Sequence, residues 1–323
     1  MINKILDNIQ VTSFLGIMVA FLLTCLCIHV FFSKLPTDQG REFAHDGKLS
    51  AGKPRGAGFL FIMVFILVAV LFGHINTENN IYLMLVFAAM LTGFLDDCSK
   101  APWGEYKKGI LDLIIAIMIA VTIINFNGTE VNIISLGITF TLPPVVFGIL
   151  AVILIWVSIN VTNCSDGVDG LSGTLTIVTL MTIYMVMELL GVSGTFGYNI
   201  LLFVVCILGY LWFNATPSKL MMGDAGSRAM GLFIAIAILK TGSPFLYIPV
   251  ALMLILDGGL GLVKVALLRF LKIHILKNTR TPLHDHVRKV KNWSNTQAVF
   301  RFAIIQIVVS IAVVYMVMIA MGR

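Results

Sequence analysis

Ten runs of apolar residues, each near the length that crosses a lipid bilayer, limit what this chain can fold into. A spanning helix needs about 20 mostly apolar residues, and the bilayer core admits only helices or closed barrels. With 59% hydrophobic and 12% charged residues, the composition is not that of a soluble domain. We predict an all-α polytopic membrane protein, one domain over residues 1–323, with about ten transmembrane helices near 12–32, 56–73, 81–95, 109–125, 145–162, 173–190, 198–213, 228–241, 245–271 and 299–321.

The connecting segments fall into two sets by their basic residues. Of the 22 Lys and Arg residues, all but Lys4, Lys240 and Arg323 belong to one set, whereas the connections at 74–80 and 126–144 hold none. The positive-inside rule places the basic set in the cytoplasm and both termini on the extracytoplasmic side. The net charge of +6 suits cations that face anionic lipid. It does not come with the basic, aromatic-interleaved patch typical of nucleic-acid binding, so no nucleic-acid partner is expected.

Five aspartates lie where predicted spans meet basic segments: Asp96, Asp97, Asp166, Asp169 and Asp224. Carboxylates are costly at bilayer depth, and like charges gathered at one face repel unless a cation lies among them. Mg²⁺ commonly takes one or two carboxylates and completes its shell with phosphate oxygens. The pattern therefore favours an enzyme that uses a divalent metal ion to handle phosphates in an active-site cleft on the cytoplasmic face.

Asp96 and Asp97 end the third predicted span. Adjacent helical residues diverge by about 100°, so one carboxylate can face a substrate as a proton acceptor while the other supports it. Lys107 and Lys108 open the next span, and Asp112 one turn later predicts an ion pair that aims Lys108 inward. The alternative explanation of Asp96 and Asp97 is an ordinary pair of carboxylates at a helix end, solvated by water on the cytoplasmic side.

Polar residues recur every three positions where the fifth predicted span ends, at Asn160, Asn163, Asp166 and Asp169. Residues three apart share a helix face, so amides and carboxylates converge on one side. Amides can hold sugar, ribose or phosphate oxygens there, and carboxylates can hold a metal ion or ribose hydroxyls. This spacing indicates a binding site more specifically than the other segments do.

Asn214 and Asp224 repeat this arrangement after the seventh predicted span. Glycines on both sides of Asp224 expose the backbone around it, and we expect this carboxylate to be the metal ligand. Arg228, one turn further on, is interpreted as an ordinary cytoplasmic cation.

The segment before the second predicted span combines His45 and Lys48 with the glycine-rich stretch 52–58. Glycines let backbone N–H groups approach an anion, and the start of a helix favours negative charge. A flexible loop with cations facing the membrane is the simpler explanation of this segment taken alone.

His284 and His286 flank Asp285 in the last basic segment. In an extended segment, residues two apart face the same side, so both imidazoles could contact one phosphate. Zinc is not favoured because no third ligand is evident nearby in the sequence. For Asp257, within the ninth predicted span, we expect a glycine hinge or kink rather than catalysis.

These motifs resemble those of the polyprenyl-phosphate N-acetylhexosamine-1-phosphate transferases over nearly the whole chain. GFLDDCSK resembles the family's aspartate-pair motif, and NCSDGVDGLSG resembles its NLTDGLDGL motif. NATPSKLMMGDAGSRAMG matches an Asn…Met-Gly-Asp-x-Gly-Ser stretch. PLHDH, with Trp293 and VFRF after it, is similar to the tail of those members that transfer phospho-N-acetylmuramoyl-pentapeptide (phospho-MurNAc-pentapeptide).

The chain departs from the family pattern at several places. Asp285 stands where the middle one of three histidines is usual, and GKPRGAG stands where GTPTMGG is usual. Met221 occupies the position where the family often has an aromatic side chain that stacks on uracil. These departures concern contacts with the nucleotide-sugar donor more than the type of reaction.

The resemblance implies transfer of phospho-MurNAc-pentapeptide from a UDP carrier to undecaprenyl phosphate in the bacterial plasma membrane. The products would be UMP and lipid I, a precursor of peptidoglycan, and the cofactor would be Mg²⁺. It further implies contact with membrane lipid, compatibility with a homodimer, and binding of nucleoside inhibitors such as tunicamycin.

Residue roles follow from the resemblance and the chemistry together. We expect Asp96 to act as the base or to orient the acceptor phosphate, with Asp97 in support, and Asp224 to hold Mg²⁺. Phosphate contacts are expected from Lys108, His284 and His286. The remaining positions are expected to bind or position the nucleotide and sugar: His45, Lys48, Asn160, Asn163, Asp166, Asp169, Asn214 and Met221.

Two other functions are compatible with parts of this pattern. A transferase of N-acetylglucosamine 1-phosphate would use the same chemistry on another sugar, although the PLHDH tail argues against it. A cation-coupled transporter would also keep carboxylates in a membrane, but it would place them near mid-bilayer at broken helices. Here they lie at predicted helix ends.

Overall fold

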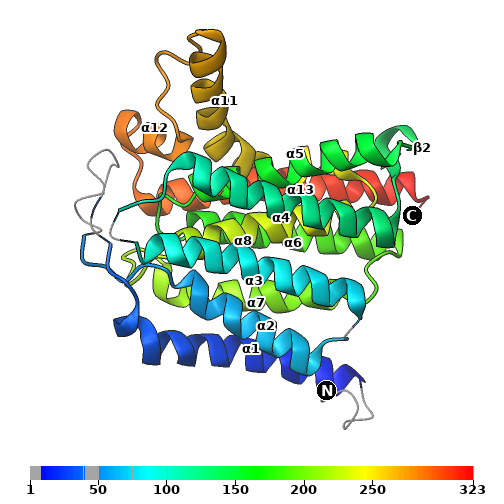
Figure 1. The fold of residues 1–323 in the computed structure, drawn as a ribbon, viewed down its shortest axis with the longest axis horizontal. Coiled ribbons are helices and arrows are strands. Elements are labelled where there is room, and N and C mark those ends of the chain that lie inside the picture. Colours follow the sequence, from blue (N-terminus) through cyan, green and yellow to red (C-terminus); the bar gives the residue numbers. More distant parts are fainter. Residues whose placement is uncertain (1–8, 39, 41–50, 75, 100, 323) are drawn as a thin grey trace.

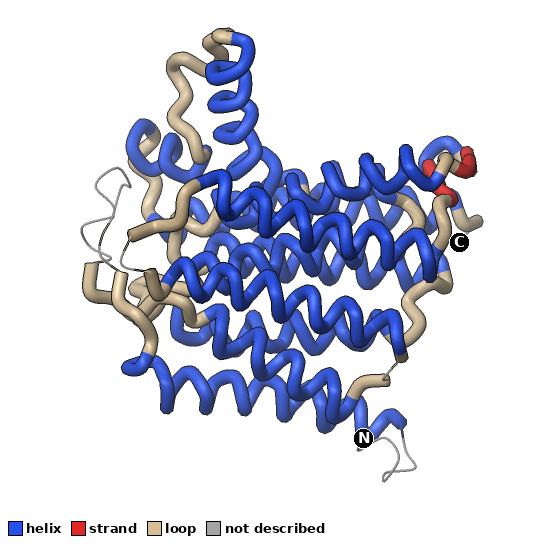
Figure 2. The backbone as a smooth tube through the Cα atoms, in the orientation of Figure 1, coloured by secondary structure: helices blue, strands red, loops and turns tan. Residues whose placement is uncertain are grey.

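The structure is a computed structural model that describes residues 9–38, 40, 51–74, 76–99 and 101–322. In these residues the fold is a bundle of long helices that run roughly parallel (Figures 1 and 2). The long helices are α1 (Ile9–Phe31), α2 (Gly58–Phe72), α3 (Thr77–Asp97), α4 (Glu105–Asn127), α5 (Pro144–Cys164), α6 (Leu171–Leu190), α7 (Phe196–Asn214), α8 (Gly223–Lys240) and α13 (Asn295–Ala320). An antiparallel hairpin of β1 (Glu130–Ile133) and β2 (Ile138–Thr141) connects α4 to α5.

Every predicted span coincides with helical structure, and nine of the ten match one long helix within a few residues. Among the described residues, seven helices are long and apolar enough to cross a membrane, and a bent pair makes an eighth. The other two predicted spans correspond to α2, which has only 15 residues, and to α8, which carries three charged residues. The all-helical membrane class is therefore confirmed, at seven to eight candidate spans.

The ninth predicted span is not one straight helix. It consists of α9 (Tyr247–Val250), α10 (Leu252–Leu254), a π-helical turn at Ile255–Gly259, α11 (Leu260–Ala266) and a second π-helical turn at Leu267–Leu271. The chain bends by 71° between Pro244–Val250 and Leu252–Leu271, and α11 projects from the bundle in Figure 1. The bend lies at Ala251 and not at Asp257, where we expected a hinge or kink; Asp257 lies instead in the first π-helical turn. Such turns often accompany functional sites.

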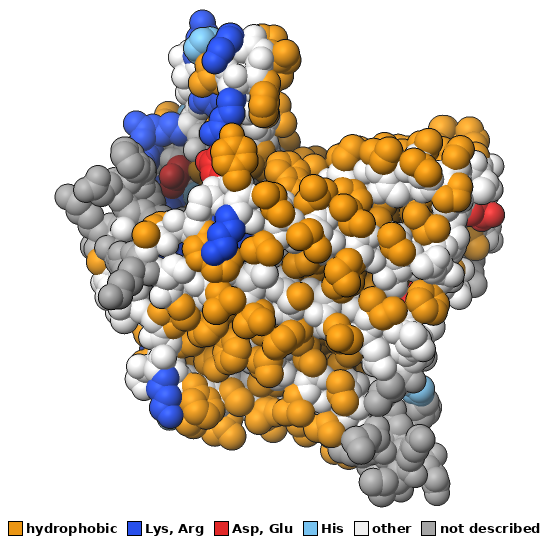
Figure 3. Space-filling model, viewed as in Figure 1, with side chains coloured by type: hydrophobic (Ala, Val, Ile, Leu, Met, Phe, Trp, Pro, Cys, Tyr) orange, Lys and Arg blue, Asp and Glu red, His pale blue; other side chains and the backbone are white. Residues whose placement is uncertain are grey.

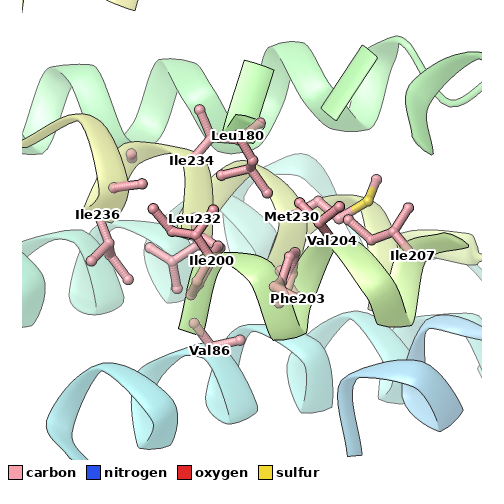
Figure 4. Close-up of a cluster of buried hydrophobic side chains, with 14 of the residues drawn as sticks. Val86, Leu180, Ile200, Phe203, Val204, Ile207, Met230, Leu232, Ile234 and Ile236 are labelled. Atoms are coloured by element: carbon pink, nitrogen blue, oxygen red, sulfur yellow. The ribbon is translucent and has the colours of Figure 1, made fainter. Parts of the chain in front are cut away.

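Helix α8 forms the centre of the bundle. All its side chains from Gly223 to Leu239 are buried, and it packs against α2, α3, α5 and α6. Figure 4 shows the apolar side chains at this contact, including Val86, Phe203 and Leu232. Apolar surface surrounds most of α8, although the carbonyl of Gly231, in the middle of the helix, accepts a hydrogen bond of 2.7 Å from Oγ of Ser158.

Glycines let the backbones of neighbouring helices touch α8. A Cβ added to Gly58 would lie 2.0 Å from the backbone nitrogen of Gly226. A Cβ added to Gly93 would lie 2.4 Å from the carbonyl oxygen of Asp224. Small residues at such crossings are typical of membrane helices. The contact at Gly93 brings the last turn of α3 beside the first turn of α8, which places the aspartate pair next to Asp224.

Polar residues divide between the two ends of the bundle. Helix α1 begins and α13 ends at the same end in Figure 1, and Lys and Arg gather at the opposite end and on the α11 projection in Figure 3. Lys240, which we assigned to the basic-poor side, pairs with Glu78 and also donates to Asn127 at 3.2 Å. That partner explains how a lysine is accommodated there.

Replacing Gly93 by alanine should lower thermal stability, because the new methyl group would force α3 away from α8. Overpacking of this kind costs about 1–3 kcal/mol. Gly109→Ala is the matched control: Gly109 also lies in a helix, but nothing lies within 4 Å of its added Cβ. That control should leave stability unchanged or raise it by up to ~1 kcal/mol. Equal melting temperatures for the two variants in detergent would contradict this packing.

Candidate active site

Lys108 joins two of the predicted carboxylates at the polar end of the bundle. Its Nζ lies 2.5 Å from Oδ2 of Asp96 and 2.9 Å from Oδ2 of Asp224. Asp96 is 6% exposed and also accepts a hydrogen bond of 2.7 Å from the backbone N–H of Trp103. The structure thus brings together one residue from the end of α3, one from the start of α4 and one from the start of α8.

Asp97 closes the N-terminus of α8. Its Oδ1 and Oδ2 accept hydrogen bonds from the backbone N–H groups of Asp224 and Ala225, each at 3.1 Å. A helix N-terminus favours an anion, because unpaired N–H groups and the helix dipole both point there. Gly223, at φ +69°, leaves room for this contact, since a Cβ there would lie 2.2 Å from Oδ2 of Asp97. Asp97 therefore fixes the position of Asp224.

Arg55 is a site residue that the sequence analysis did not single out. Its guanidinium approaches Asp97 at 2.8 Å, Asp224 at 3.2 Å and Asp38 at 3.4 Å. Burial alone lowers the pKa of Arg55, but these carboxylates outweigh it and raise the pKa, so the side chain stays cationic. Its position directly before an apolar span was the signal that could have identified it.

The expected pairing of Asp112 with Lys108 is wrong. Asp112 forms an ion pair with Arg228 instead, and both side chains are buried between α4 and α8. The i, i+4 spacing predicts a surface pair, whereas Arg228 reaches Asp112 through the helix contact. Arg228 is accordingly an internal partner, not an ordinary cytoplasmic cation.

The third motif lies at the end of α5 and in the turn that follows. Asn163 donates to Oγ of Ser227 at 2.9 Å, which ties this motif to the first turn of α8. Asp166 and Asp169 are half-buried in the turn, and Asp169 accepts from the backbone N–H of Ser218 at 3.3 Å. The side-chain amide of Asn160 donates to the carbonyl of Trp156, one turn earlier in the same helix, and so bonds within α5.

Asn214 ends α7, and Met221 belongs to the segment that leads from there into α8. Asn214 is 5% exposed, accepts from the N–H of Gly170 at 2.8 Å and donates to the carbonyl of Leu220 at 2.8 Å. Its amide thereby joins the turn after α5 to the segment before Asp224. The backbone of Met221 pairs with the glycine-rich stretch, donating to Pro54 at 2.8 Å and accepting from Ala57 at 3.0 Å.

His284 is buried against Asp257, a second residue whose role the sequence analysis missed. Oδ1 of Asp257 accepts from the His284 backbone N–H at 2.7 Å, and Nδ1 of the ring lies 2.8 Å from Oδ2. Burial alone lowers the pKa of His284, but Asp257 reverses this, with help from Asp285 and Asp166, and the pKa is raised. An ionisable residue within an apolar run is itself a signal of function, which would have identified Asp257.

The extended geometry expected for the last basic segment is wrong. Residues Leu283–Val290 form helix α12, so His284 and His286 point in different directions. Nε2 of His284 faces the turn after α5, where a Cβ on Gly167 would lie 2.3 Å from it. His286 is half-buried and accepts from the backbone N–H of Arg280 at 3.3 Å. His45 and Lys48 lie outside the described residues.

The donors around Asp224 are hard carboxylate oxygens, the type that Mg²⁺ prefers. Within the described part of the chain, no three His, Cys, Asp or Glu side chains lie close enough to hold a metal ion by themselves. A Mg²⁺ ion bound here would take Asp224 and complete its shell with phosphate oxygens, as the ion usually does. The residues present therefore fit a metal ion that is shared with a phosphate substrate.

Comparison with known proteins identifies the family. The family model described as "Glycosyl transferase family 4" matches residues 79–242, which include the aspartate pair, the third motif and Asp224. A relative from Treponema pallidum (strain Nichols), named "Phospho-N-acetylmuramoyl-pentapeptide-transferase", is 37% identical over 94% of this chain and 88% of its own length.

Relatives of lower sequence identity have the same name. The one from Thermotoga neapolitana is 28% identical over 84% of this chain and 88% of its own. The one from Rubrobacter xylanophilus is 28% identical over 90% of this chain and 93% of its own. The resemblance seen in the sequence motifs is confirmed, and the chain belongs to glycosyl transferase family 4, together with the phospho-N-acetylmuramoyl-pentapeptide-transferases.

Proposed function

We propose that this chain transfers phospho-MurNAc-pentapeptide from its UDP carrier to undecaprenyl phosphate, giving lipid I and UMP in the bacterial plasma membrane. The observation that carries the proposal is the convergence of Asp96, Lys108 and Asp224 at one end of an apolar bundle. Carboxylates and cations at the end of spanning helices suit a reaction between a water-soluble anion and a lipid phosphate. The family membership supports the same reaction.

The reaction joins two anions that repel each other. An oxygen of the acceptor phosphate bonds to the sugar-linked phosphorus of the donor, the bond from that phosphorus to the bridging oxygen breaks, and that oxygen leaves on UMP. Mg²⁺, when bound, supplies positive charge that screens donor and leaving group. Lys108 supplies a second cation, since its ammonium already lies between Asp96 and Asp224.

The two aspartates of the pair take different parts in this scheme. Asp96 contacts Lys108 through Oδ2, so it can orient the acceptor phosphate or accept its proton. Acceptor phosphates have a second pKa near 6 and need little help from a base at neutral pH. Asp97 supports the site by holding the first turn of α8 and the guanidinium of Arg55.

The donor is placed by the turn after α5 and by α12. Asp257 orients the ring of His284, whose Nε2 faces the turn that carries Asp166 and Asp169. A cationic imidazole in this place can donate a hydrogen bond to a phosphate of the UDP-linked substrate. His286, Asn163 and Met221 provide further contacts to the nucleotide and sugar.

The membrane arrangement that fits this function has ten spans in a single domain, with both termini extracytoplasmic. The start of α1 and the end of α13 lie at one end of the bundle, which supports an even number of crossings (Figure 1). The basic residues lie at the other end, which supports a cytoplasmic location of that end (Figure 3). We also expect nucleoside inhibitors such as tunicamycin to compete with the donor, and a homodimer to be compatible with the exposed apolar surface.

Mass spectrometry of the lipid product tests the reaction. Purified protein incubated with Mg²⁺, undecaprenyl phosphate and UDP-MurNAc-pentapeptide should form lipid I and UMP, whereas UDP-GlcNAc should give no product. Asp224→Asn should abolish turnover because an amide lacks the charge that holds Mg²⁺. Glu105→Gln removes a carboxylate at the same end that is 79% exposed, and it should remain active. A lipid product from UDP-GlcNAc alone would favour the sister transferase.

Asp257→Asn should change how stability depends on pH. The raised pKa of His284 means that its pair with Asp257 stabilises the folded chain below the ordinary histidine pKa of about 6.5. That stabilisation is lost as the pH rises through the raised pKa. The melting temperature of Asp257→Asn should therefore fall most at acidic pH, and His284→Gln should flatten the same profile. His286→Gln is the control that should preserve the wild-type profile, and identical profiles for all four proteins would contradict the pairing.

A further inference from the structure

Arg55 draws together carboxylates from three separate segments. Its Nε lies 2.8 Å from Oδ1 of Asp97, its Nη2 lies 3.2 Å from Oδ1 of Asp224, and its Nη1 lies 3.4 Å from Oδ1 of Asp38. Lys108 contacts the other oxygen of Asp224 at 2.9 Å. Both oxygens of the expected metal ligand therefore face cations that belong to the protein itself.

The contact of Asp224 with Arg55 is the weaker of the two. Hydrogen bonds between charged groups usually measure about 2.7–2.9 Å. The contact to Lys108, at 2.9 Å, lies within that range, whereas the contact to Arg55, at 3.2 Å, does not. Arg55 also stays held by Asp97 when it releases Asp224. A third cation that approaches Asp224 would consequently exchange with Arg55 first.

The backbone beneath Arg55 is fixed to the segment that leads into Asp224. Met221 donates to the carbonyl of Pro54 at 2.8 Å, Ala57 donates to Met221 at 3.0 Å, and Gly58 donates to Met222 at 3.0 Å. These bonds hold the residue directly before Arg55 and two residues shortly after it. The guanidinium can turn away from Asp224, but its Cα cannot leave, so the positive charge remains near any metal ion that binds there.

We propose that Arg55 competes with a divalent metal ion for Asp224 and so keeps the metal affinity of this site low until an anionic diphosphate arrives. The inference rests on the proposed role of Asp224 as the metal ligand. A diphosphate can accept the released guanidinium in a bidentate pair. Binding of the metal ion and of the diphosphate then favour one another, because each relieves the charge that opposes the other.

Titration of Mn²⁺ into purified protein without substrates tests this competition, with free Mn²⁺ measured by electron paramagnetic resonance. Arg55→Gln and Arg55→Ala should each bind Mn²⁺ about tenfold more tightly than the wild type, a typical coupling between charged sites. Arg55→Lys keeps the charge and should stay near the wild-type affinity. Arg269→Gln is the control, because its exposed pair with Glu105 lies outside the cluster.

The same titration distinguishes the role of Asp224 as metal ligand from the competition by Arg55. Asp224→Asn should abolish the Mn²⁺ site, and a site that survives this change refutes the assignment of the metal ligand. If Asp224→Asn loses the site but neither truncation of Arg55 tightens it, the competition alone is refuted and the proposed reaction stands. Tighter binding that also appears in Arg55→Lys would overturn the argument from charge.

Discussion

Carboxylates packed together at the end of an apolar helix bundle need cations beside them, and this requirement governs the structure around the candidate site. Lys108 joins Asp96 to Asp224, and Arg55 joins Asp97 to Asp224. Without such partners, buried like charges would repel each other and lose their hydration. The residues that we propose bring substrate anions and a metal ion together are thus the same residues that stabilise the polar end of the bundle.

The central helix makes this clustering geometrically feasible. Gly58 and Gly93 allow α2 and α3 to contact the backbone of α8, so the aspartate pair lies directly beside the first turn of α8. Asp97 then accepts the unpaired N–H groups of that turn. Helix α8, whose side chains are almost all buried, consequently links the packing deep in the bundle to the geometry of the candidate site at its end.

Much of this arrangement could be predicted from the sequence because its signals are local. Apolar runs predicted the positions of the helices, and the polar motifs predicted that Asp96 and Asp224 gather at one end, where Lys108 contacts both. The contacts of Arg55 could not be predicted, since its three carboxylates come from segments far apart in the chain. Asp112 was matched with the wrong cation because helical spacing describes exposed pairs, whereas its partner Arg228 lies on another helix.

The location of a bound metal ion tests the central claim most directly. Crystals of the protein with Mn²⁺ and the UDP-linked donor would show the ion by its anomalous scattering. The account predicts the strongest peak beside a carboxylate oxygen of Asp224, with Lys108 close to the donor phosphates. A peak on Asp166 or Asp169, with Asp224 still held by Arg55 and Lys108, would contradict it.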